Sequence, residues 1–310
     1  MSLRVIGAAE VARRLTYQIC IPLMREAMIA LSEGRTRQLL RGIVDLDHGN
    51  LFGVMPGSLD GGPFGAKLIS IFPGNVAEGG LSHQGFVLLF DPDTGAPTAV
   101  IDAGELTGIR TAAASAAATD VLARPASRTL AILGTGEQAR RHIEAIRLVR
   151  PIERVTIWGR ARDKAEALAG TLGAEVAADV RAAVKDADIV CTTTAATEPV
   201  LFSDWVAEGA HLNLVGSSHA GPVEVDNALV ARARFFADHR EGVLAQGAEF
   251  LNAKAAGLID DAHLLGEIGE VMAGTLPGRL GDADVTAYKS LGSIVQDLAS
   301  AAFLVRSDAS

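Results

Sequence analysis

The stretch TLAILGTGEQA, residues 129–139, decides how the middle of this chain folds. Its first five residues form an aliphatic run of strand length, and a glycine loop with the spacing G-x-G-x-x-A follows at residues 134–139. An amphipathic pattern over residues 137–148 predicts a helix directly after the loop. Gly134 would allow a tight turn, Gly136 the approach of a pyrophosphate, and Ala139 close packing of helix on strand. This order predicts a dinucleotide-binding site, and the alternative is an ordinary strand–turn–helix corner.

Strand and helix patterns alternate on the far side of this loop. Helix patterns are expected at residues 163–172 and 180–185, and a final helix at about 288–305. The strand patterns are RVTIWG (154–159), EV (175–176), DIVCTTT (188–194), HLNLVGS (211–217) and RFFAD (234–238). Such alternation predicts right-handed βαβ crossovers and a parallel sheet.

The end of the second strand bears on the choice of cofactor. A carboxylate at this place would bind the ribose 2′-OH of NAD, but Gly159 follows Trp158, and Arg160 and Arg162 come next. A guanidinium there can pair with the 2′-phosphate of NADP. We therefore expect NADP(H) to be preferred, with NAD(H) possible; alternatively, the two arginines only cap a surface loop.

Further cofactor contacts are expected at the carboxyl ends of the parallel strands, where small and hydroxylated residues fit beside a nicotinamide ring. Either strand end could also be a simple loop. The expected cofactor-binding residues are Thr111, Gly134, Thr135, Gly136, Glu137, Gln138, Gly159, Arg160, Arg162, Thr192, Thr193, Thr194, Gly216, Ser217, Ser218 and Ser290.

The first third of the chain has a different texture. After a short strand at residues 4–6 and helical patterns to about residue 33, strand signals dominate, and they predict a mixed or antiparallel sheet. The strand signals are GIVDL (42–46), LFGVM (51–55), AKLISIF (66–72), QGFVLLFD (84–91) and PTAVID (97–102). A helix rich in small residues is expected at 111–123, ended by Pro125.

Composition limits the classes of protein. The 310 residues suffice for two domains, and 49% hydrophobic with 21% charged residues excludes a disordered chain. A net charge of −9 speaks against nucleic acid. Cys20 and Cys191 have neither disulfide nor zinc spacing, and no metal site is expected. Without a signal peptide or a spanning segment, the chain is expected in the cytoplasm and not in a membrane.

Six motifs in order make the chain resemble the ornithine cyclodeaminase/mu-crystallin family over nearly its whole length. They are GVMP (53–56), AKLIS (66–70), SHQGFVLLF (82–90), LTGIRTAAAS (106–115), GTGEQA (134–139) and YKSLG (288–292). The resemblance implies an α/β fold in which a Rossmann NAD(P)-binding domain, residues 123–290, is inserted into a mixed α+β domain, residues 1–122 and 291–310. That outer domain would bind substrate and form a homodimer.

Lys67 is the strongest catalytic candidate because it interrupts an apolar run. Burial would lower its pKa and let it polarise an imine or carry a proton; the alternative is an edge-strand lysine that blocks aggregation. The family's active-site lysine matches Lys67, and the resemblance implies that Arg110 and Arg41 hold a substrate carboxylate. Surface salt bridges are the alternative, more so for Arg41. Met55 is expected to line the substrate pocket.

The chain departs from ornithine cyclodeaminases in one loop. Where those enzymes have an aspartate, this sequence has Ser218, and His219 follows it. His219 could take over part of the proton transfer because its ordinary pKa is near neutral, or it is an exposed loop histidine. A methionine at position 55 also cannot accept the distal amine of ornithine.

We therefore expect an NAD(P)H-dependent reductase of a small imino or ketimine carboxylate, such as pyrroline-2-carboxylate or iminosuccinate, or an amino-acid dehydrogenase running the reverse reaction. The alternatives are an ornithine cyclodeaminase and a non-enzymatic NADPH- or ligand-binding protein.

Overall fold

The computed structural model describes residues 3–78 and 80–306. The chain divides into two compact units, one of residues 1–110 and 293–310 and one of residues 111–292. The predicted α/β class is therefore confirmed, with a parallel-sheet unit inserted into a mixed one. The first boundary lies after Arg110, within helix α3 (Ala103–Leu122), whereas the expected domain boundary followed residue 122.

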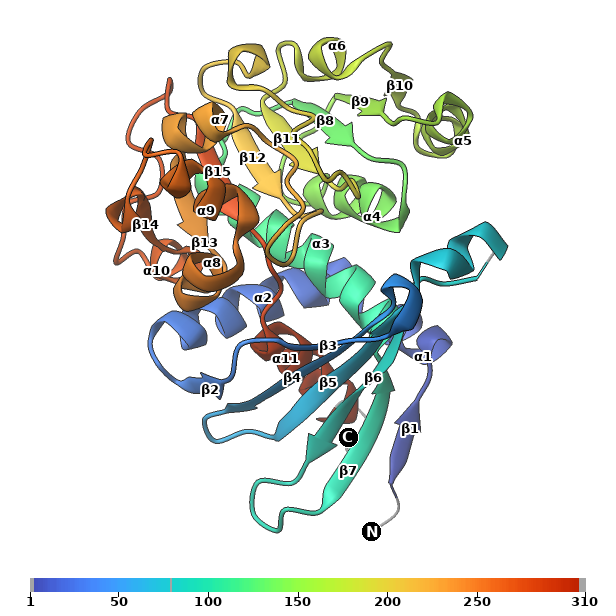
Figure 1. The fold of residues 1–310 in the computed structure, drawn as a ribbon. Coiled ribbons are helices and arrows are strands. Elements are labelled where there is room, and N and C mark those ends of the chain that lie inside the picture. The colour runs from blue at the N-terminus through green and yellow to red at the C-terminus, as the bar shows by residue number, and fades with distance from the viewer. Residues whose placement is uncertain (1–2, 79, 307–310) are drawn as a thin grey trace. The chain divides into compact units, whose positions relative to one another are not determined.

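The first unit is built on a mixed seven-stranded sheet, drawn in blue to cyan in Figure 1. The strand order is β1-β7-β6-β5-β4-β2, with β3 also paired to β4; β1 runs parallel to β7 and the other pairs are antiparallel. The strands are β1 (Arg4–Ile6), β2 (Thr36–Gln38), β3 (Gly42–Asp45), β4 (Leu51–Leu59), β5 (Phe64–Ile71), β6 (His83–Phe90) and β7 (Pro97–Asp102). The helices are α1 (Ala8–Arg14), α2 (Tyr17–Ser32), the first part of α3, and α11 (Ile294–Arg306).

One face of this sheet is buried under α11, which packs on β4, β5 and β6 (Figure 1). Alternate residues of a strand point to opposite faces, so residues paired across strands share a face. Met55 pairs with Lys67, and Lys67 with Val87, so the three form a row on the covered face. All three are buried. The sheet thus places the lysine inside the core of the unit.

The second unit contains an eight-stranded sheet in which every pairing is parallel. Its order is β10-β9-β8-β11-β12-β15-β13-β14. From β8 the chain adds β9 and β10 on one side and then β11 and β12 on the other, so the strand order reverses between β8 and β11. Parallel sheets bind ligands at the carboxyl ends of the strands beside such a reversal. The strands are β8 (Thr129–Leu133), β9 (Arg154–Trp158), β10 (Glu175–Val176), β11 (Ile189–Thr192), β12 (His211–Leu214), β13 (Arg234–Ala237), β14 (Leu264–Glu267) and β15 (Thr286–Lys289). The helices besides α3 are α4 (Glu137–Ile146), α5 (Arg162–Leu172), α6 (Val180–Val184), α7 (Asn227–Arg232), α8 (Arg240–Gln246), α9 (Ala248–Ala255) and α10 (Ile268–Met272).

Two helix predictions were wrong at their starts. Helix α3 begins at Ala103, not at residue 111, and the Asp102 carboxylate accepts a hydrogen bond from the N–H of Glu105 in its first turn. The final helix begins at Ile294, because Tyr288 and its neighbours form strand β15 between β12 and β13. A buried parallel strand of four residues has no periodicity that separates it from a helix.

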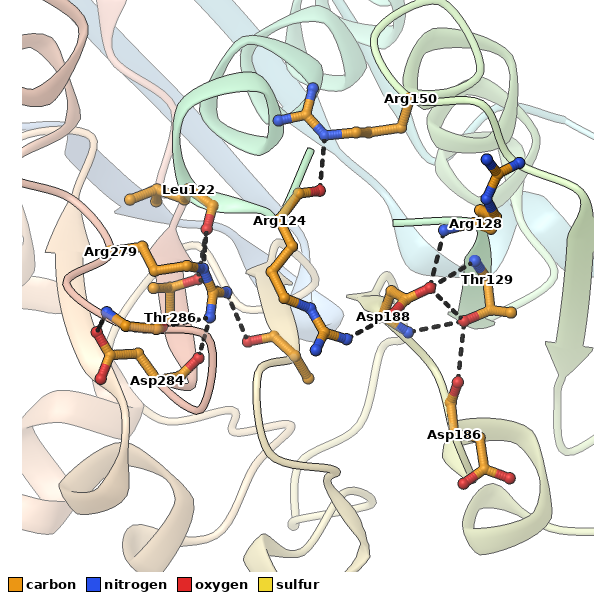
Figure 2. Close-up of polar contacts among 12 residues, drawn as sticks. Leu122, Arg124, Arg128, Thr129, Arg150, Asp186, Asp188, Arg279, Asp284 and Thr286 are labelled. Atoms are coloured by element: carbon orange, nitrogen blue, oxygen red, sulfur yellow. Dashed lines mark hydrogen bonds and ion pairs between the residues drawn. The ribbon is translucent and has the colours of Figure 1, made fainter. Parts of the chain in front are cut away.

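The amino-terminal edge of the parallel sheet is bound up in polar contacts, as Figure 2 shows. The Asp188 carboxylate, just before β11, accepts hydrogen bonds from the backbone N–H groups of Arg128 and Thr129 at the start of β8 and from the Arg124 guanidinium, at 2.8, 3.0 and 2.6 Å. Arg279 donates to Thr286 Oγ1 at the start of β15. Ligand sites of parallel sheets lie at the carboxyl ends of the strands, so the opposite edge is the one to search for a site.

None of the helices in the described ranges is both long enough and apolar enough to cross a membrane.

Candidate active site

A buried carboxylate joins the two main candidate residues of the first unit. Asp297 on α11 accepts a hydrogen bond at its Oδ1 atom from Arg110 Nε at 3.0 Å, and Lys67 Nζ lies 3.4 Å from the same oxygen. Thr107 Oγ1 accepts a second hydrogen bond from Lys67 Nζ at 2.6 Å, and Gln296 Oε1 accepts one from Arg110 Nη1 at 2.8 Å. The structure therefore brings together Lys67 and Arg110, as predicted, around an aspartate that the sequence reasoning did not identify.

The pKa of the Lys67 amine is shifted toward neutral pH. Burial lowers its pKa to about 7, Asp297 acts against that shift, and the positive charges of Arg110 and Arg41 add to it. A group with a pKa near the working pH is present in both protonated and neutral forms, which general acid–base catalysis requires. Lys67 is not the edge-strand lysine of the alternative interpretation, because β5 lies between β4 and β6.

The two other predicted substrate residues lie in the same unit. Arg41 is half-buried just before β3, and its charge reaches Lys67. Met55 is 5% exposed and is the direct partner of Lys67 across β4 and β5. The side of Lys67 that faces β4 is therefore apolar.

The glycine loop of the second unit has the geometry that the motif predicts. Gly134 has φ of 132°, and a Cβ there would lie 2.5 Å from Thr193 Oγ1, so only glycine fits. Gly136 is the N-cap of α4 without a side-chain cap, and a Cβ on it would meet nothing within 4 Å. Uncapped N–H groups at an open helix N-terminus suit an anion such as a pyrophosphate. Thr135 lies between these glycines, and Glu137 and Gln138 form the first turn of α4.

The turn after β9 carries the two predicted arginines. A Cβ on Gly159 would lie 2.4 Å from Thr135 Cγ2, so this glycine lets the turn pack against the glycine loop. Arg162 is 69% exposed and pairs with Glu166 on α5 at 2.7 Å. Arg160 is exposed and makes no hydrogen bond or ion pair with any residue in the described part of the chain. Of the two arginines, Arg160 is the one free to meet a ligand.

A second buried carboxylate, Glu224, organises the carboxyl ends of β11 and β12. It accepts hydrogen bonds from Thr192 Oγ1 at 2.6 Å, from the Thr194 hydroxyl and N–H at 2.7 and 2.6 Å, and from Gly216 N–H at 2.7 Å. Thr193 Oγ1 donates instead to the Leu133 carbonyl at 3.1 Å. The hydroxyls of all three threonines are thus engaged in hydrogen bonds inside the protein.

A buried lysine, Lys289, donates a hydrogen bond to the loop after β12. Lys289 on β15 is fully buried, pairs with Glu249 Oε2 at 2.8 Å and donates to the Ser217 carbonyl at 2.7 Å. Ser218 and His219 follow in the same loop and are half-buried. The exposed histidine of the alternative interpretation is therefore not what the structure shows.

The last two predicted cofactor residues, Thr111 and Ser290, are both buried. Thr111 lies in α3 and is 8% exposed. Ser290 follows β15 and is 3% exposed, and its Oγ atom has no hydrogen-bond partner among the residues that the structure describes. A buried hydroxyl without a partner is costly, so Ser290 is suited to a ligand or a water molecule.

Asp297, Glu224 and Lys289 were missed because each lies within a run that predicts core. The available signal was the one used for Lys67, a charged residue inside an apolar stretch: IVQDLASAAFL for Asp297, PVEV for Glu224 and VTAYK for Lys289. Charged groups are rarely fully buried unless paired. Within residues 3–78 and 80–306, no group of three His, Cys, Asp or Glu side chains could hold a metal ion.

Fold and geometry define a two-unit α/β protein whose inserted unit is of the dinucleotide-binding type, with a buried lysine–carboxylate–arginine cluster in the other unit. The chain belongs to the ornithine cyclodeaminase/mu-crystallin family, whose model matches residues 3–310. This confirms the resemblance seen in the sequence.

Relatives of known activity cover almost the whole chain. Ketimine reductase mu-crystallin of Mus musculus is 36% identical over 304 residues, 96% of this chain and 94% of the relative. The Delta(1)-pyrroline-2-carboxylate reductase of Paracoccus denitrificans is 37% identical over 292 residues, 91% and 92% of the two chains. The structure is similar to that of Thermococcus litoralis Delta(1)-pyrroline-2-carboxylate reductase in complex with NADH and L-proline, with a TM-score of 0.94, 30% identity, and coverage of 97% of this chain and 96% of that one.

Proposed function

We propose that this protein is an NAD(P)H-dependent reductase of a small imino or ketimine carboxylate, or an amino-acid dehydrogenase running the same reaction in reverse. The observation that carries the proposal is the Lys67–Asp297–Arg110 cluster, in which an amine with a pKa of about 7 is buried beside a guanidinium. Reduction of an imine requires a proton donor for its nitrogen at neutral pH. The guanidinium is suited to bind the carboxylate of the substrate. The reductases named above support the same reaction class.

The residues of the cluster have separate tasks. Lys67 Nζ has three donor positions, of which Thr107 and Asp297 occupy two, so one remains for the imine nitrogen. Arg110 uses Nε and Nη1 within the protein, and its Nη2 atom donates to no residue that the structure describes. That nitrogen, together with Arg41, would hold the substrate carboxylate.

The second unit fits a nicotinamide dinucleotide. The helix N-terminus at Gly136 would hold the pyrophosphate, and the loops organised by Glu224 would line the nicotinamide end. Ser290 directly follows β15, and its hydroxyl, unpartnered among the described residues, would offer a further hydrogen bond to the cofactor. The reduced cofactor supplies the hydride of the reaction. His219 is proposed only as an auxiliary proton carrier in the loop after β12.

The test is NADPH oxidation at 340 nm with pyrroline-2-carboxylate, piperideine-2-carboxylate, iminosuccinate, and pyruvate with ammonia. Turnover with at least one of these substrates is expected. Formation of proline and ammonia from ornithine would instead indicate a cyclodeaminase, which we do not expect because Met55 and Ser218 offer no carboxylate for the distal amine. Tight NADPH binding without turnover on any imine would indicate a binding protein.

The cofactor preference rests on Arg160. Replacing Arg160 with alanine should raise the KM for NADPH roughly tenfold to a hundredfold and leave the KM for NADH nearly unchanged, because a hydrogen bond to a charged group contributes about 1.5–3 kcal/mol. Arg162→Ala is the matched control: its guanidinium already pairs with Glu166, so a smaller effect is expected. Wild-type kcat/KM values for NADH equal to or above those for NADPH would contradict the preference.

The uncovered face of the first sheet supports a homodimer. It presents Val5, Val44, Phe64 and Phe86, which are 71%, 54%, 38% and 51% exposed. Register places all four on the face opposite Lys67. An apolar sheet face of this kind is typical of an interface.

Phe86→Glu is therefore expected to convert a dimer into a monomer in light scattering, since the substitution buries a charge at the proposed interface. Leu258→Glu, which alters a leucine of the other unit that is 54% exposed, should leave the dimer intact. A wild-type monomer at micromolar concentration would argue against this assembly.

We also propose that the protein resides in the cytoplasm, where its two buried cysteines stay reduced.

A further inference from the structure

Asp297 is the point where the catalytic and the carboxylate-binding candidates meet. Its side chain is fully buried, and its Oδ1 atom lies 3.0 Å from Arg110 Nε and 3.4 Å from Lys67 Nζ. Its Oδ2 atom is also buried and accepts no hydrogen bond from any described residue. Among the described residues, the side chain of this carboxylate is therefore hydrogen-bonded by two cations alone.

We propose that Asp297 is a positioning residue that orients Lys67 and Arg110 through one shared oxygen and keeps on Lys67 the proton that imine reduction consumes. This inference rests on the reductase function proposed above.

The charges around Lys67 show why a carboxylate is needed there. Arg110 of α3 and Arg41 before β3 both disfavour the charged amine, and His83 of β6 lies within electrostatic reach. Cys20 of α2 faces the same cluster but is neutral, because burial raises the pKa of its thiol to about 12. Burial and two guanidinium groups would together leave Lys67 without a proton at neutral pH, and Asp297 opposes them.

The proton balance of the reaction fits this role. As the carbon of the C=N bond gains its hydride, the π electron pair moves to nitrogen and takes a proton from the Lys67 ammonium, forming the N–H bond. Lys67 is left as a neutral amine and regains a proton from water. The charge of Asp297 favours the ammonium form of Lys67 and so lowers the cost of restoring it between turnovers.

A direct measurement of Lys67 protonation tests the proposal. The chain has five lysines, so Lys67 can be followed by its ¹³Cε resonance in lysine-labelled protein and assigned by its loss in Lys67→Met. The wild-type midpoint is expected near 7. Asp297→Asn should move the midpoint to lower pH by about one unit or more, since it removes an opposite charge within reach of the amine.

Arg110→Gln should move the midpoint in the other direction, to higher pH, because it removes a like charge and a competitor for Oδ1. Gln296→Met is the neutral control: Gln296 touches Arg110 but carries no charge, so the midpoint should change by less than about 0.3. If Asp297→Asn does not fold, Asp297→Ser, which also removes the carboxylate, takes its place and should move the midpoint in the same direction.

A midpoint near the ordinary lysine value in the wild type, or one that removal of the Asp297 carboxylate leaves unmoved, would overturn the proposal. Equal shifts in all three variants would show a merely structural disturbance and overturn it as well. Because the resonance is read without substrate, these outcomes are separate from a failure of wild-type protein to reduce any imine, which would refute the proposed function instead. With an active enzyme, the fall in kcat at high pH should follow the same midpoints.

Discussion

Lys67→Met is expected to lower kcat for imine reduction by a factor of roughly 10²–10⁴, the usual contribution of a positioned acid–base group. Methionine has a similar length and fills the same buried space between Met55 and Val87, so the packing of β5 is retained. The amine that would donate the proton is gone, while Arg110, the proposed partner of the substrate carboxylate, remains paired with Asp297.

The measurement is kcat and KM with the best substrate of the imine panel, together with the Kd for NADPH. We expect the loss in kcat, and a Kd within a few-fold of wild type because the glycine loop belongs to the other unit. Lys254→Met is the matched control, since Lys254 is an exposed lysine paired with Asp261. A Lys67→Met variant that keeps more than a tenth of the wild-type kcat would reject the assignment.

Gly134→Ala is expected to destabilise the second unit by about 2–4 kcal/mol, the range for a residue forced into a disallowed conformation with a close contact. The backbone there has φ of 132°, and the added methyl would lie 2.5 Å from Thr193 Oγ1 and 2.7 Å from the Thr193 carbonyl oxygen. Thr193 cannot retreat easily, because its N–H and hydroxyl both donate to the Leu133 carbonyl.

Urea unfolding of the two variants Gly134→Ala and Gly136→Ala separates the fold from the binding site. Gly136 has φ of −83° and open space at its Cβ position, so its alanine variant should unfold like the wild type. The same variant should bind NADPH at least about tenfold more weakly if the pyrophosphate approaches this backbone, because the motif glycine is needed for that approach. Wild-type stability of Gly134→Ala, or unchanged NADPH affinity of Gly136→Ala, would contradict the respective assignment.

Local sequence patterns predicted the parts of this protein that are specified by interactions between residues close together in the chain. The order of aliphatic strand, glycine loop and amphipathic helix predicted β8 and α4, and helix α4 begins at Glu137 as expected. A lysine inside an apolar strand identified Lys67, since an unpaired charge in such a place is costly and therefore meaningful. The alternation after residue 127 predicted a parallel sheet, which is confirmed.

The tertiary structure decided the features that depend on distant pairing. Whether residues 286–289 form a strand depends on the neighbours β12 and β13, and four buried residues carry no period of their own. Asp297 lies 230 positions from Lys67 and 187 from Arg110, and only the packing of α11 on the sheet brings them to one oxygen. The sequence by itself determined which residue types were available for chemistry. The fold determined their protonation, because burial and the distance between charges exist only once the chain has packed.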